Sequence, residues 1–382
     1  MENNTISYSR STCITLGKYG DKWDNTSADT ADGYVNTIER AGKNGWSDVG
    51  YHVIRGNKIS HCGQAGIVGS LGATFSEVSE NEIHDIHVRH DFTGAEIAAI
   101  KFHAPINSLI KNNHIYNSFR GIWLDWMTQG ARVTGNFLHD NAGSQDLFLE
   151  VNHGPFLVDH NIVVSANAED PNWLVKYFYG NYMPWNLQRS VLDMSQGGTY
   201  AHNLFMGGIM LRDELERDTP FMAPNSTQVI GLKPIKGGDS HYYNNVLINR
   251  GVDRYGDDSV PTSFNGNVYL GEAEPYSLDK NAHVAADITP EINVVEKDDG
   301  WYLNINADKS WAGAIQRSLV TTEMLGKTRV TGETYKTPKG LNFRLDHDYL
   351  GASRNTDNPF PGPFSQNTLQ GKLIKVWSKS AE

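Results

Sequence analysis

The chain has 382 residues, which is enough for two domains or for one extended repeat architecture. Apolar residues make up 39% and charged residues 20%, a composition that excludes a disordered protein, and no run approaches the roughly 18 apolar residues of a membrane helix. The 33 basic and 44 acidic residues leave a net charge of −11. This charge would repel a phosphate backbone, so we expect neither a nucleic-acid nor a membrane partner.

Cysteine content and the N-terminal sequence say little about compartment. With Cys13 and Cys62 alone, the chain can form neither a disulfide framework nor a multi-cysteine metal site. The segment MENNTISYSR lacks the basic and apolar parts of a signal peptide, so a cytoplasmic protein is expected if this is the natural N-terminus. The 37 glycines and abundant asparagines are typical of a turn-rich β protein.

A short pattern recurs along the chain: an Asn followed two positions later by an aliphatic or aromatic residue. From Asn57 onward the intervals are 24, 32, 23, 25, 42, 42 and 22 residues, which indicates a unit of about 21 to 25 residues, once lengthened and twice doubled. Each unit contains short apolar strands separated by Gly, Asn or Asp turns. The repeated residues are Asn4, Asn57, Asn81, Asn113, Asn136, Asn161, Asn203, Asn245 and Asn267.

Short strands in units of this length, with no intervening helix, predict an all-β fold, a right-handed parallel β-helix in which each coil pairs with the next. The Asn would sit at a corner of every coil, where it tolerates a left-handed backbone and its amide can join a ladder of side-chain hydrogen bonds. The alternative is an antiparallel sandwich with Asn in its turns. A sandwich requires no fixed period, so we favour the β-helix.

The predicted β-helix covers residues 1–272, with insertions at about 24–44 and 167–189. The first insertion contains a candidate helix, and the second carries six aromatic residues that we expect to shape a substrate site. Residues 273–382 are predicted to form a β-rich, sandwich-like accessory region. Because the first repeat Asn has only three residues before it, we also expect the chain to lack N-terminal coils that would cap it.

Superposing the units by their apolar pattern aligns GIWLDW, DLFLEV and AIKFHA. Asp125, Glu150 and His103 then fall in one column, and equivalent positions on adjacent strands are about 4.8 Å apart. Two carboxyls at that spacing repel when both are ionised, so one pKa should rise. Retaining glycosidases use such a pair, with carboxyls roughly 5 to 5.5 Å apart. An Asp or Glu taken alone on a β-helix face is usually a solvated surface group, but the stacking of these two favours a functional pair.

Five further residues complete the predicted site as substrate-binding groups. His103, which could also be a packed histidine, is expected to contact sugar. Glu96 is either a third carboxylate or a turn residue. Trp123 and Trp126 should point to opposite faces, so we expect one in the core and one exposed beside Asp125, where it could stack on a pyranose. The predicted substrate-binding set is Glu96, His103, Trp126, His153 and Lys101.

These segments together resemble glycoside hydrolase family 120, the family of β-xylosidases built on a right-handed β-helix. The resemblance rests on KNGWSDVG, CGQAGIVGSLGATFSEV, EIAAIKFHAPI, GIWLDWMTQGARV, LEVNHGPFLVDHNI and DMSQGG, which occur in that order. It covers about residues 43–270. The chain departs from the family pattern at Ala95 and Ser70, where family members often carry histidine.

The resemblance implies that Asp125 is the nucleophile, that Glu150 is the general acid/base and that Glu96 is a further active-site carboxylate. The expected activity is that of a retaining exo-acting β-xylosidase on short xylo-oligosaccharides, without cofactor or metal and with homo-oligomerisation left open. One alternative is a β-helix polysaccharide lyase, for which Lys101 or Arg120 would serve as base, although the acidic chain disfavours an anionic polymer. The other is a non-catalytic carbohydrate-binding or structural β-helix.

Overall fold

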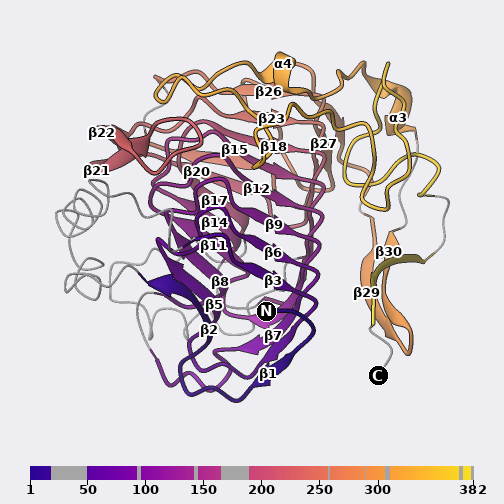
Figure 1. Ribbon diagram of the computed structural model, residues 1–382. Coiled ribbons are helices and arrows are strands. Elements are labelled where there is room, and N and C mark those ends of the chain that lie inside the picture. Colours follow the sequence, from indigo (N-terminus) through magenta and orange to yellow (C-terminus); the bar gives the residue numbers. More distant parts are fainter. Residues whose placement is uncertain are drawn as a thin grey trace.

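The computed structural model describes residues 1–18, 50–92, 96–141, 145–164, 189–256, 259–288, 290–305, 310–369 and 373–379. The strands wind into a coil in which three parallel sheets form the walls (Figure 1). The insertion predicted at 24–44 lies outside the described residues. The same holds for the aromatic insertion up to residue 188, and Arg189 already belongs to a strand of the coil.

The largest wall is a ten-stranded parallel sheet, which we call the ten-stranded sheet. Its strands, in order, are β1 (Thr5–Ser7), β4 (Lys58–Ser60), β7 (Glu82–Ile86), β10 (His114–Ser118), β13 (Phe137–His139), β16 (Ile162–Val164), β19 (Leu204–Phe205), β24 (Val246–Ile248), β27 (Val268–Leu270) and β28 (His283–Ala285). Because β28 pairs with β27 in parallel, the coil extends past the boundary expected at residue 272.

The other two walls are eight-stranded parallel sheets, which we call the β11 sheet and the β12 sheet. The β11 sheet contains β2 (Thr12–Lys18), β5 (Ala65–Ser70), β8 (Ala98–His103), β11 (Ile122–Asp125), β14 (Gln145–Glu150), β17 (Arg189–Met194), β20 (Ile209–Arg212) and β25 (Val252–Tyr255). The β12 sheet contains β26 (Ser263–Asn265), β23 (His241–Tyr243), β18 (Gly198–Ala201), β15 (Phe156–Asp159), β12 (Ala131–Thr134), β9 (Leu109–Lys111), β6 (Glu77–Ser79) and β3 (Val53–Arg55).

Consecutive strands along the chain lie in different walls, and each wall receives its next strand one coil later. The interior of the coil is filled by alternate residues of all three walls, among them Ile67, Ile100, Ile122 and Leu147, which stack in register along the β11 sheet. This arrangement confirms the predicted parallel β-helix. It also explains the sequence period, because one repeat unit is one coil. The interpretation of the two 42-residue intervals as doubled units was wrong: Asn161, Asn203 and Asn245 are successive ladder residues, so each interval is a single coil with an insertion.

An asparagine ladder runs along the inside of one corner, as predicted. Nδ2 of Asn113, for example, donates to Oδ1 of Asn136 at 2.9 Å, and Asn136 donates to Asn161 at 2.9 Å. The conformational part of the prediction was wrong, because the left-handed residue is the one before the ladder Asn: Asn112 has φ 51° and Gly135 has φ 63°. The preceding residue turns the chain, and the ladder side chain can then point inward to its buried partners.

The C-terminal region forms an antiparallel three-stranded sheet of β29 (Ile292–Lys297), β30 (Gly300–Ile305) and β31 (Ile374–Ser378), with short helices α3 (Trp311–Ala314) and α4 (Thr322–Leu325). Leu303 and Val376 join one apolar cluster with Phe137 and Leu270 of the ten-stranded sheet. Among the described residues, this region contributes one sheet, and that sheet packs on the ten-stranded sheet of the β-helix. Among the described residues, no helix has the length and apolar character needed to cross a membrane.

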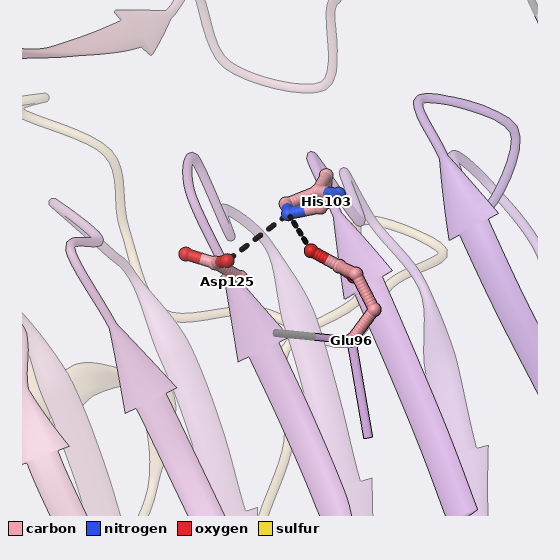
Figure 2. A group of neighbouring side chains, drawn as sticks. All are labelled: Glu96, His103 and Asp125. Carbon is pink, nitrogen blue, oxygen red and sulfur yellow. Dashed lines mark hydrogen bonds and ion pairs between the residues drawn. The ribbon is translucent and has the colours of Figure 1, made fainter. Parts of the chain in front are cut away.

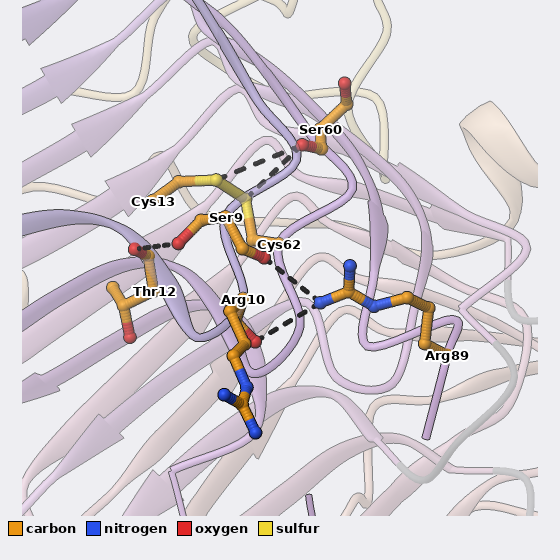
Figure 3. Close-up of a disulfide and its surroundings, with 7 residues drawn as sticks. All are labelled: Ser9, Arg10, Thr12, Cys13, Ser60, Cys62 and Arg89. Carbon is orange, nitrogen blue, oxygen red and sulfur yellow. Dashed lines mark hydrogen bonds between the residues drawn. A yellow bond between two sulfur atoms is a disulfide. The ribbon is translucent and has the colours of Figure 1, made fainter. Parts of the chain in front are cut away.

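Cys13 and Cys62 form a disulfide, with their Cα atoms 5.6 Å apart (Figure 3). The cysteine count alone did not predict this bond. It joins β2 to the segment between β4 and β5, and Arg89 donates to the main-chain oxygens of Ser9 and Arg10 close by. Because disulfides are rare in a reducing cytosol, this bond does not favour the cytoplasmic location expected from the N-terminal sequence.

Candidate active site

Three adjacent strands of the β11 sheet bring the predicted column together at their carboxyl ends. His103 on β8 pairs with Asp125 on β11, and β11 pairs with β14 in the register that aligns Leu124 with Leu149. Asp125 and Glu150, one residue further on, therefore occupy equivalent positions on neighbouring strands. All three column residues are buried, and each is 5–6% exposed.

The carboxylate of Asp125 is held by donors on both oxygens. Oδ2 lies 2.7 Å from Nζ of Lys101 and 3.0 Å from Nε2 of His103, and Oδ1 accepts the main-chain N–H of Trp126 at 2.8 Å (Figure 2 shows the His103 contact). Burial would raise the pKa of Asp125, but the positive charge of Lys101 and the hydrogen bonds from Lys101 and His103 outweigh it and hold that pKa below its ordinary value. Asp125 is therefore ionised.

Glu96 completes a compact ion cluster with Lys101, His103 and Asp125. Glu96, His103 and Asp125 offer potential metal-ligand atoms within 4.8 Å of one another (Figure 2). However, Nζ of Lys101 is within 3.2 Å of all three side chains. A divalent cation would have to sit beside this buried ammonium, whose charge repels it. We interpret the group as a hydrogen-bonded ion cluster centred on Lys101.

Glu150 has a different environment. Its Oε1 pairs with Nη1 of Arg217 at 2.7 Å, and its Oε2 accepts the indole N–H of Trp123 at 3.0 Å. Burial and the nearby negative charge of Asp125 raise the pKa of Glu150, although Arg217 and Lys101 oppose the rise. The two carboxyls of the column thus have pKa values shifted in opposite directions.

Trp123, rather than Trp126, lies on the face that carries the carboxyls. Positions 123 and 125 are two apart in the strand, with only Leu124 between them, so both side chains point outward from β11. The expected exposed aromatic is absent at Trp126, whose side chain is 5% exposed and packs with apolar residues including Val151 and Met222. That prediction was wrong because an element outside the repeat, described next, covers Trp126.

This covering element is an antiparallel hairpin of β21 (Glu214–Met222) and β22 (Val229–Ile235), inserted in the chain between β20 and β23. His153 contacts its base: Nε2 lies 3.0 Å from the Thr219 oxygen and 3.1 Å from that of Lys233, and Nδ1 lies 3.0 Å from Nε2 of Gln196. Both ring nitrogens of His153 thus contact protein atoms. The geometry favours His153 as an anchor of the hairpin over the expected sugar contact.

Arg217 is the site residue that sequence reasoning missed. It lies in the charged segment RDELERD, whose composition is typical of a solvent-exposed strand and which contains no residue of the Asn repeat. The hairpin brings it over the β11 sheet, where its guanidinium lies 5.8 Å from the Trp126 ring centroid as well as beside Glu150. A useful signal would have been the interval of 42 residues between Asn203 and Asn245, which marks an insertion within one coil.

Comparison with known proteins agrees with this architecture. Residues 1–180 match the protein family described as "Right handed beta helix region". The coil is a right-handed β-helix. The chain is also similar to the protein in the solved structure "The complex structure of XylC with xylose", with 31% sequence identity and a TM-score of 0.83. That match covers 98% of this chain and 61% of the other, so the chain spans less than two thirds of its relative. No curated protein matches the chain.

Proposed function

We propose that this chain is a retaining exo-glycosidase that releases xylose from the non-reducing end of xylo-oligosaccharides. The observation that carries the proposal is the placement of Asp125 and Glu150 at equivalent positions on adjacent strands, with their pKa values shifted in opposite directions. The strand spacing of about 4.8 Å is near the roughly 5 to 5.5 Å between the carboxyls of retaining enzymes. An inverting enzyme needs a wider separation, roughly 6.5 to 9.5 Å, to hold a water between its carboxyls.

In the proposed mechanism, Asp125 attacks the anomeric carbon while Glu150 protonates the departing oxygen. The covalent sugar–Asp125 ester is then hydrolysed by a water that gives its proton to Glu150. Formation of the ester removes the charge of Asp125, so the pKa of Glu150 falls when a base is needed. The ion cluster of Glu96, Lys101 and His103 lies beside Asp125. We assign Glu96, its most exposed member, to a hydroxyl group of the bound sugar; Lys101 has no exposed surface and instead holds the two carboxylates in place, which argues against the sugar contact expected of it.

The choice of xylose rests on the similarity to XylC, which was solved in complex with that sugar, and on the sequence resemblance to β-xylosidases. The lyase alternative fits the site less well. A lysine must be neutral to act as the base of a lyase. Burial alone would lower the pKa of Lys101, but the nearby carboxylates of Asp125 and Glu96 outweigh burial and raise that pKa, so Lys101 stays charged. Arg120, the other candidate, is 1% exposed and lies over the Trp123 ring.

The test is hydrolysis of an aryl β-xyloside and of xylobiose, with the first product followed by NMR. We expect β-xylose as the initial anomer, and no turnover by Asp125→Ala on either substrate. Initial release of α-xylose would exclude the retaining mechanism. Absence of reducing sugar together with an unsaturated, ultraviolet-absorbing product would support the lyase instead. Binding without either product would leave the non-catalytic alternative.

A further inference from the structure

Both oxygens of Glu150 already carry a hydrogen-bond donor. Trp123 Nε1 donates to Oε2 at 3.0 Å, and Arg217 Nη1 pairs with Oε1 at 2.7 Å. A general acid must direct a protonated oxygen at the leaving group. Arg217 occupies Oε1 and pairs with its negative charge, so Oε1 can direct a proton at the leaving group only after Arg217 withdraws.

The two donors differ in how easily they can move. The Trp123 side chain is 7% exposed, and two cations pack on its ring, with Lys101 Nζ at 3.7 Å and Arg120 Cζ at 4.6 Å from ring centroids. Arg217 instead extends from the hairpin outside the coil, and its side chain is 34% exposed. A neighbouring carboxylate, Glu214 Oε2, lies 3.5 Å from its Nε and can hold the guanidinium after it leaves Glu150.

We propose that Arg217 is a positioning residue that opposes protonation of Glu150 in the empty site and gives up Oε1 to the leaving-group oxygen when substrate binds. The inference rests on the proposed function. When Arg217 withdraws, Oε1 takes a proton from solvent and passes it to the glycosidic oxygen. That oxygen keeps the electron pair of the breaking bond to the sugar. Oε1 then accepts the proton of the attacking water, and Arg217 returns to the carboxylate after that proton has been released to solvent.

The charges that face Glu150 decide the direction of the expected effect. Asp125 on β11 and Glu214 on β21 are negative, and Lys101 on β8 and Arg217 on β21 are positive. Burial and Asp125 raise the pKa of Glu150, and without Arg217 only one of the two positive charges, that of Lys101, still lowers it. The pKa of Glu150 should then rise further, and Glu150 should remain an acid to higher pH.

The first measurement is the pH dependence of kcat/KM for a xyloside with a poor leaving group. In Arg217→Gln, we expect the alkaline limb to move upward by about one pH unit, the size of effect of one nearby charge. Arg217→Lys keeps the charge and should stay near the wild type. The matched control is Lys233→Gln, which removes a positive charge from the exposed side of the same hairpin and should leave the limb unchanged. An unshifted limb in Arg217→Gln would refute the inference.

A second readout separates this inference from the proposed function. Carboxyl ¹³C NMR titration, with the Glu150 signal assigned through Glu150→Gln, reports the pKa without any turnover. A rise in Arg217→Gln but not in Lys233→Gln supports control of Glu150 by Arg217, even if the protein hydrolyses no glycoside. An unchanged titration refutes that control, even in an active enzyme. If Arg217→Gln does not fold, the Glu150 pKa is measured in Arg217→Lys instead. The inference expects this pKa to stay near the wild-type value, because the positive charge is kept, and a clear rise in Arg217→Lys would count against it.

Discussion

Nζ of Lys101 lies 2.7 Å from Oδ2 of Asp125, and the Lys101 side chain has 0% exposure. A buried ammonium is costly unless its partners satisfy it, and here Asp125, Glu96 and His103 all lie within hydrogen-bonding distance. The pair therefore links two neighbouring coils and, at the same time, sets the charge of the proposed nucleophile.

Lys101→Met should make Asp125 harder to ionise. Without the ammonium, the effect of burial on the pKa of Asp125 is no longer outweighed, so the acidic limb of the pH profile should move to higher pH. We expect kcat/KM at mildly acidic pH to fall by about 10²-fold, which is typical for loss of one electrostatic partner. Lys58→Met, at a side chain 54% exposed, is the control. An acidic limb identical to that of the wild type would contradict the assignment.

Glu150→Ala should spare substrates whose leaving groups need no proton and slow those with poor leaving groups by about 10² to 10⁴. Azide needs no general base, so it should rescue the variant and yield a β-glycosyl azide from an α-linked intermediate on Asp125. Product analysis by NMR checks the configuration. Recovery of an α-azide would show that no such intermediate had formed.

Asp193 on β17 should make stability depend on pH. Burial raises its pKa to about 6, although Tyr242 donates to Oδ2 at 2.6 Å. The unfolded value is near 3.9, so the folded state binds the proton more tightly. Stability is then full below about pH 4, falls as pH rises through 6, and is lower by about 3 kcal/mol above that. The difference in unfolding free energy between the wild type and Asp193→Asn, measured by denaturant from pH 4 to 8, should change by that amount. A constant difference would contradict it.

Asn136→Ala should destabilise the coil by about 2 to 5 kcal/mol, because it leaves several buried polar groups without partners. Asn136 donates to Asn161 and to the Ile110 oxygen, and it accepts two N–H groups of Asn113. Thermal or denaturant unfolding measures the loss. The exposed Asn367 provides the control, and Asn367→Ala should have little effect. Equal stabilities of the two variants would show that the ladder contributes little.

The repeat made much of this structure predictable, because parallel coils place equivalent sequence positions side by side. Asparagine spacing therefore predicted the ladder, and superposed units predicted that Asp125 and Glu150 would be neighbours. Contacts made by segments outside the repeat cannot be predicted in this way, because the repeat does not place those segments relative to the coil. Arg217 reaches Glu150 through an inserted hairpin, and the same hairpin buries Trp126, so neither contact follows from local pattern. The Cys13–Cys62 bond likewise depends on which corner of the coil each residue occupies.

Two separate parts of the structure, the coil and the β21–β22 hairpin, contribute residues to the proposed site. The proposed nucleophile Asp125 and the Lys101 ammonium belong to the coil, where each strand must fit the strands before and after it. The cation beside the proposed proton donor comes from the β21–β22 hairpin, which lies outside the three sheets of the coil. The hairpin is attached along its length, by His153 at Thr219 and Lys233 and by Gln129 at Met222 next to its turn. An exchange of this hairpin could therefore change which leaving groups are accepted while the sugar-binding side remains intact. For protein engineering, the hairpin is therefore the segment to exchange, while the sequence of the coil is kept unchanged.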